Sequence, residues 1–149
     1  ERKILEKVRI QKTIVYTLLF ILALTCDATT NRFIEKIDWL IFYNIRKNIV
    51  VNVLEKKYNP NIEYNSNLFE LPFCFPLVSN DNNRIVIYRN DTGKTQAVEF
   101  FIEHNWYEEP SARFVFSNDK NTQLDLNALI IKDKKHNWKI KENWYRISY

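Results

Sequence analysis

The residues of this chain that are best suited to chemistry include two histidines that are far apart in the sequence. His104 and His136 each belong to an HNW tripeptide at the expected end of a hairpin. A metal site would need both, together with Glu103 or Glu108. This spacing matches no familiar ligand pattern, so we interpret both histidines as exposed loop residues. The sequence therefore predicts no metal site and no cofactor.

The two cysteines are expected to be unpaired thiols. Cys74 lies between Phe73 and Phe75, which favours a buried thiol, and no histidine near it in the sequence would activate it as a nucleophile. Cys26 ends an apolar stretch. Two alternatives remain: a disulfide, which would require the region around Cys74 to return to that stretch, and lipidation of Cys26.

The segment NDTGKT at 90–95 contains fragments of two catalytic or binding motifs. GKT ends a phosphate-binding loop, but that motif needs a glycine where Tyr88 stands. DTG occurs in aspartic proteases, but there it follows an apolar strand, and here it follows Arg89–Asn90. We therefore expect a hairpin turn in which Gly93 has a positive φ. Because no catalytic set is found elsewhere, we do not expect an enzyme.

The first element expected along the chain is an uncharged helix near its start. Residues 13–26 contain no charged side chain, and as a helix they would span about 21 Å of a hydrocarbon layer that is about 30 Å thick. Lys12 can extend toward water, so a helix from about Val8 to about Thr30 would cross the layer. The residues expected in the bilayer are Ile14, Leu18, Leu19, Phe20, Ile21, Leu22 and Leu24.

The distribution of charge predicts the orientation of that helix. Residues 1–26 hold five Lys or Arg and two Asp or Glu, whereas residues 27–149 hold seventeen and sixteen. The positive excess places the N-terminus inside and the remaining chain on the periplasmic, lumenal or intermembrane side. The nearly balanced charge of residues 27–149 argues against nucleic-acid binding. A cleaved signal or lipoprotein leader, and a buried core helix, are the alternatives.

We expect a basic lead and a transmembrane helix at 1–30, followed by an extramembrane α+β domain at 31–149. Apolar residues at 34, 37, 41, 45, 49 and 53 recur at helical spacing. They predict a long amphipathic helix over 31–58, capped by Asn31 or Thr30 and stopped by Pro60. This helix should pack on a four- or five-stranded antiparallel sheet.

The strands of that sheet are predicted from β-branched and aromatic residues. They are expected at 84–89, 96–104, 112–117, 124–132 and 138–149, the last with a bulge near 142–143. Residues 59–83 should form an extended segment over the core. The order of span, long helix and sheet resembles the general plan of NTF2-like periplasmic domains, in layout and length alone, and it implies no functional residue.

Aromatic residues supply the candidate interaction site. The segments HNWYEE, HNWKI and ENWYR contain Trp106, Tyr107, Trp138, Trp144 and Tyr145. Their rings would either pack across strands or form a face that anchors a partner subunit, a sugar or the membrane interface.

These observations together predict a single-pass membrane protein. We expect a non-catalytic accessory or assembly subunit of a larger membrane complex, whose partners are other subunits and the lipid bilayer. The alternative is an extracytoplasmic ligand-binding module or lipoprotein that uses the aromatic face.

Overall fold

The computed structural model describes residues 17, 27–103 and 112–149, with only the backbone for 27–31 and 103. The expected bilayer residues, and also Cys26, His104, Trp106, Tyr107 and Glu108, lie outside this part. Within it, no helix is both long and apolar enough to cross a bilayer, so the transmembrane helix stays a prediction. The chain divides into two compact units, one ending at Ile41 and the other spanning Phe42–Tyr149.

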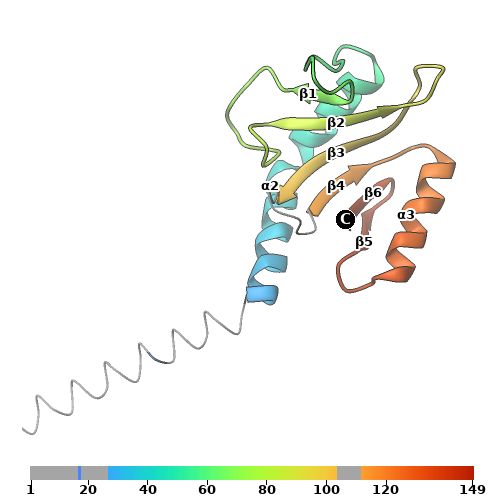
Figure 1. Cartoon of the computed structure of the whole chain (residues 1–149). Coiled ribbons are helices and arrows are strands. Elements are labelled where there is room, and N and C mark those ends of the chain that lie inside the picture. The colour runs from blue at the N-terminus through green and yellow to red at the C-terminus, as the bar shows by residue number, and fades with distance from the viewer. Residues whose placement is uncertain (1–16, 18–26, 104–111) are drawn as a thin grey trace, which may run out of the picture. The chain divides into compact units, whose positions relative to one another are not determined.

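The long helix predicted after the uncharged stretch is present as α2, Asp27–Leu54 (Figure 1). The expected caps, Asn31 and Thr30, lie inside the helix, so that part of the prediction is wrong. The helix also ends earlier than expected, because Lys56 adopts a left-handed φ of 59°. The N–H of Lys57 then donates to the carbonyl of Asn52 at 2.9 Å and closes the helix end.

The apolar stripe of α2 is buried only in part. Ile49 and Val53 belong to the core, where they are 3% and 0% exposed. Ile34, Ile37 and Ile41 are 56%, 40% and 62% exposed, so the expectation that the whole stripe faces the core is wrong. Apolar residues at helical spacing predict an apolar stripe on the helix, but they do not show what packs against that stripe.

Six antiparallel strands form one sheet, in the order β1-β2-β3-β4-β6-β5. Their bounds are β1 Leu68–Glu70, β2 Arg84–Arg89, β3 Thr95–Glu103, β4 Ala112–Phe116, β5 Trp138–Lys141 and β6 Trp144–Ser148. The α+β class and the antiparallel sheet are confirmed, and the sheet has more strands than the four or five predicted.

The last predicted strand, 138–149, is a hairpin. Lys141 pairs with Trp144, which leaves Glu142 and Asn143 as a two-residue turn. Asn143 has a φ of 63°, a conformation that asparagine adopts more readily than most residues. The expected bulge is therefore a turn, and it reverses the chain direction.

The strand predicted at 124–132 is wrong, because this segment is the helix α3, Lys120–Lys132. Asp119 caps the helix, and its carboxylate accepts the backbone N–H of Thr122 at 3.0 Å. Leu126 is 4% exposed and Leu124 is 67% exposed. Two residues separated by one position would lie on the same face of a strand, whereas on a helix they point in different directions.

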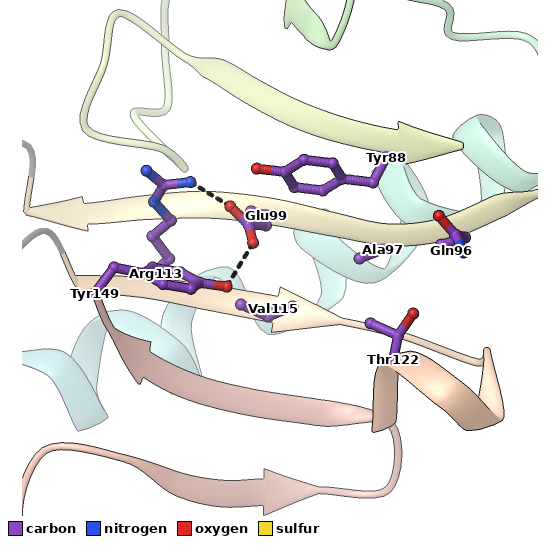
Figure 2. A pocket seen from close by; sticks show the side chains of 8 residues that line it. All are labelled: Tyr88, Gln96, Ala97, Glu99, Arg113, Val115, Thr122 and Tyr149. Carbon is purple, nitrogen blue, oxygen red and sulfur yellow. Dashed lines mark hydrogen bonds and ion pairs between the residues drawn. The ribbon is translucent and has the colours of Figure 1, made fainter. Parts of the chain in front are cut away.

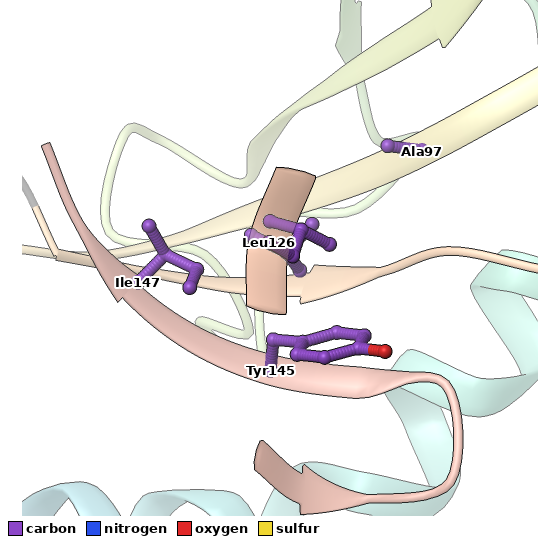
Figure 3. Packing of buried hydrophobic residues seen from close by; sticks show 5 residues of the cluster. Ala97, Leu126, Tyr145 and Ile147 are labelled. Carbon is purple, nitrogen blue, oxygen red and sulfur yellow. The ribbon is translucent and has the colours of Figure 1, made fainter. Parts of the chain in front are cut away.

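Within Phe42–Tyr149, the end of α2 and the helix α3 pack on opposite faces of the sheet. The guanidinium of Arg46, in the 42–54 part of α2, lies 4.7 Å from the ring centre of Phe114. Leu126 of α3 belongs to the same buried cluster as Val115 and Tyr145, and Figure 3 shows Leu126 together with Tyr145. Neighbouring strand residues such as Phe114 and Val115 point to opposite faces, so the sheet lies between α3 and this part of α2.

The segment before β2 differs from the expectation in one respect. Cys74 is exposed, so the prediction of a buried thiol is wrong. Its neighbour Phe75 is also exposed, at 84%. The segment is held from within by the side chain of Asn83, which donates to the carbonyl of Pro76 at 2.9 Å.

Candidate functional site

The structure describes three of the five predicted interaction residues, and their rings are in different environments. Trp144 is 3% exposed and its ring lies 5.9 Å from that of Phe100. Tyr145 is 0% exposed and points to the α3 face, where it packs with Leu126. Trp138 is half-buried beneath the guanidinium of Arg146. These three rings do not form one exposed aromatic face.

The other predicted sites can be located in the same way. His136 is exposed, and its Nδ1 lies 2.7 Å from a carboxylate oxygen of Asp133. This hydrogen bond is the main reason why the pKa of Asp133 is lowered. Across 27–103 and 112–149, no three metal-ligating side chains are grouped for an ion. The predicted turn is confirmed, since Gly93 has a φ of 75°.

A cavity of about 360 Å³ opens on the α3 face of the sheet (Figure 2). Strands β2, β3 and β4 form its floor, and Thr122 at the start of α3 forms part of its edge. The side chains that line it are Tyr88, Gln96, Ala97, Glu99, Arg113, Val115, Thr122 and Tyr149. Ala97 and Val115 also belong to the core beneath α3, so the cavity adjoins packed, rigid structure.

Glu99 is the central polar group of the cavity and is only 3% exposed. In the β3–β4 register Phe101 pairs with Arg113, and this places Arg113 on the same face as Glu99. The guanidinium of Arg113 forms an ion pair with Oε2 of Glu99. The hydroxyl of Tyr149 donates to Oε1 at 2.9 Å. Both carboxylate oxygens are therefore hydrogen-bonded, as a buried charge requires.

Aromatic rings hold Arg113 in place. Its guanidinium lies 4.7 Å from the ring centre of Phe101 and 5.1 Å from that of Tyr149. Burial acts to lower the pKa of Arg113, but the charge and hydrogen bond of Glu99 outweigh it, so the pKa is raised. Arg113 is consequently a fixed positive charge in direct contact with a fixed negative one.

The two tyrosines of the cavity remain protonated at neutral pH. Burial and, next, the charge of Glu99 raise the pKa of Tyr149 and of Tyr88. Tyr149 as a whole is 51% exposed, but its hydroxyl end lies inside against Glu99. Both phenols therefore supply neutral hydroxyl groups to the cavity.

The sequence contained a signal for this site that our sequence analysis did not use. Glu99 interrupts the apolar run AVEFF, and Arg113 interrupts ARFVF. A charged residue inside an apolar strand needs a partner. The partner could not be assigned from the sequence, because it depends on the register of β3 against β4.

A second feature is the exposed apolar stripe of α2. We define it by Phe33, Ile34, Ile37, Leu40 and Ile41, which are 64%, 56%, 40%, 75% and 62% exposed. Their spacing places them on one side of the helix. Large apolar side chains gathered in this way typically mark an interaction surface.

The chain matches no known family model, no curated protein and no solved structure. The functional assignment therefore depends on the cavity, the apolar stripe and the sequence.

Proposed function

We propose that this chain is a non-catalytic accessory or assembly subunit of a larger membrane protein complex, anchored by a single helix that contains residues 13–26. The observation that carries the proposal is the apolar stripe of α2. A catalytic role is not proposed, because Glu99, the acid that lines the cavity, is already engaged by Arg113 and Tyr149.

Burial of the stripe by a partner would contribute a substantial favourable hydrophobic free energy. Fully burying one large apolar side chain is worth about 1.5–3 kcal/mol, and each of the five side chains is at least 40% exposed. The stripe also follows the uncharged residues 13–26 closely in the sequence. A helix anchored through those residues would hold the stripe next to the membrane, where the other subunits of a complex are found.

The charges around the stripe favour a protein partner over lipid. A helix that lies on a membrane surface usually carries mainly Lys and Arg on its polar side. Here the charged residues within 32–41 are Arg32, Glu35, Lys36 and Asp38, two basic and two acidic residues. This mixture of signs lacks the basic excess that draws a helix to an anionic lipid surface, which favours a protein partner for the stripe.

Substitution of one stripe residue tests the proposal. In native membranes extracted with mild detergent, the full chain should migrate in a species well above its own 18.1 kDa. Leu40→Glu places a charge in the stripe and should release the chain from that species, because an unpaired charge in an apolar interface costs several kcal/mol.

The matched control is Leu124→Glu, since Leu124 is a similarly exposed leucine on α3, at 67% against 75% for Leu40. This variant should remain in the large species. A wild-type chain that is extracted as a lone 18.1 kDa protein would contradict the proposal. So would a Leu40→Glu variant that stays in the complex.

A further inference from the structure

The cavity on the α3 face and the apolar stripe are formed by different residues. Its lining residues lie within Phe42–Tyr149, whereas the stripe lies in the residues up to Ile41. We propose that this cavity binds a small, uncharged, hydroxyl-rich ligand of one or two sugar rings. The charge, the hydrogen-bonding groups and the shape of the cavity each support this class.

The charge of the cavity favours an uncharged ligand. Glu99 and Arg113 carry one charge each, and the two groups are already in contact. An anionic ligand that approached Arg113 would also meet the carboxylate of Glu99, and a cationic ligand would meet the guanidinium. A charged ligand would therefore lose its hydration without gaining an unopposed partner.

The hydrogen-bonding groups suit a ligand that donates and accepts at many positions. A carboxylate offers about four acceptor sites, so Glu99, which accepts from Arg113 and Tyr149, can accept from further groups. Gln96 is half-buried and lines the cavity, and its side-chain amide has no hydrogen bond to the residues that the structure describes. Gln96 therefore offers both a donor and an acceptor, and Tyr88 adds a hydroxyl group. Each hydroxyl of a sugar can likewise donate and accept.

The remaining surface of the cavity is apolar and partly aromatic. Ala97 and Val115 form apolar floor, and the ring of Tyr88 lies over the sheet and points toward Glu99 (Figure 2). A sugar ring has apolar C–H faces between its hydroxyl groups, so it matches such alternation. The volume of about 360 Å³ lies in the range of about 300–1,000 Å³ found for small-molecule sites.

Ligand-observed NMR on the full chain in nanodiscs free of glycolipid tests this proposal. The neutral probes are glucose, N-acetylglucosamine, maltose and cellobiose, and the charged probes are glucuronate and glucosamine. We expect at least one neutral probe to bind saturably at millimolar concentration. The charged probe that most resembles it in structure should bind about tenfold more weakly, which corresponds to roughly 1.4 kcal/mol.

The variant for this experiment is Gln96→Ala. Because this side chain has no hydrogen bond to the described residues, its loss should leave the fold intact, which the melting temperature will show. The affinity for the neutral probe should fall about tenfold, the upper range for one neutral hydrogen bond. Asn121→Ala, at an exposed position of α3, should leave the affinity unchanged.

Three results would overturn the proposal: no neutral probe binds, a charged probe binds as tightly as its neutral counterpart, or binding is unaffected by Gln96→Ala. Each of these would leave the role of the apolar stripe untouched, because Leu40 and its neighbours take no part in the experiment. Conversely, a chain that forms no membrane complex could still bind the sugar.

Discussion

Asn83 fixes the segment that precedes β2 by hydrogen bonds in several directions. The residue is 0% exposed. Its Oδ1 accepts the backbone N–H of Val78 at 2.7 Å and that of Ser79 at 3.2 Å. Its Nδ2 donates to the carbonyls of Phe73 and Pro76. One side chain thus satisfies four backbone groups of a segment that lacks regular structure over most of its length.

We predict that Asn83→Ala destabilises the protein by about 3 kcal/mol more than Asn82→Ala, because buried backbone groups lose their partners. Asn83 and Asn82 have left-handed φ values of 58° and 49°, so placing alanine at either position carries a similar conformational cost. Asn82 is exposed and serves as the matched control. Urea unfolding measures both, and equal losses would show that the hydrogen bonds of Asn83 contribute little.

Tyr149 makes stability sensitive to alkaline pH. Burial and Glu99 raise the pKa of its phenol above the ordinary value of 10.0, so the folded chain keeps a proton that the unfolded chain releases. The stabilising contribution is therefore present below about pH 10 and is lost as the pH rises.

We predict that Tyr149→Phe reduces the loss of unfolding free energy between about pH 9 and pH 11. Tyr64→Phe should leave that pH dependence as it is in the wild type, and Tyr64 is 75% exposed. Urea unfolding at several pH values gives the two slopes. If the wild type and Tyr149→Phe lose stability equally, the phenol is not protected by the fold.

At the scale of the elements, α3 is the clearest test of the fold. We predict that Leu126→Ala costs about 3 kcal/mol, since it opens a cavity against the sheet. Leu124→Ala should cost less than about 0.5 kcal/mol, because Leu124 is largely exposed. If the segment were a strand, the two leucines would share a face, and similar losses from both variants would contradict the helix.

Elements with a clear periodic pattern of apolar residues were predicted correctly from the sequence. The apolar spacing of α2 and the β-branched runs of β2, β3 and β4 were sufficient, and Gly93 marked its turn. The segment 124–132 was misread because short apolar runs fit either element, and the capping group of Asp119 decides for the helix. The hairpin at Asn143 was misread because an alternation that slips is compatible with a bulge or a turn.

The cavity could not be predicted because it depends on long-range pairing. Glu99 and Arg113 are fourteen positions apart and meet only in the register of β3 against β4. Tyr149 reaches Glu99 from fifty positions away. By contrast, the sequence marked every residue of the apolar stripe as apolar, but it could not show that this part of α2 is exposed.

At the scale of the whole molecule, two features with different chemistry lie in different units. The cavity belongs to Phe42–Tyr149 and has compensated charges, and the apolar stripe lies in the residues up to Ile41. A subunit that binds a complex through one unit keeps the other available for a ligand. We therefore expect Leu40→Glu and Gln96→Ala to remove the two proposed roles separately.

We propose that a protein subunit covers the apolar stripe in a membrane complex. The most direct measurement places a photo-cross-linking amino acid at position 40 of the full chain in native membranes, and at position 124 as the control. We expect a cross-link from position 40 to one membrane protein, which Ile37→Glu abolishes, and no such product from position 124. Cross-links from position 40 to lipid alone, or the same products from both positions, would contradict it.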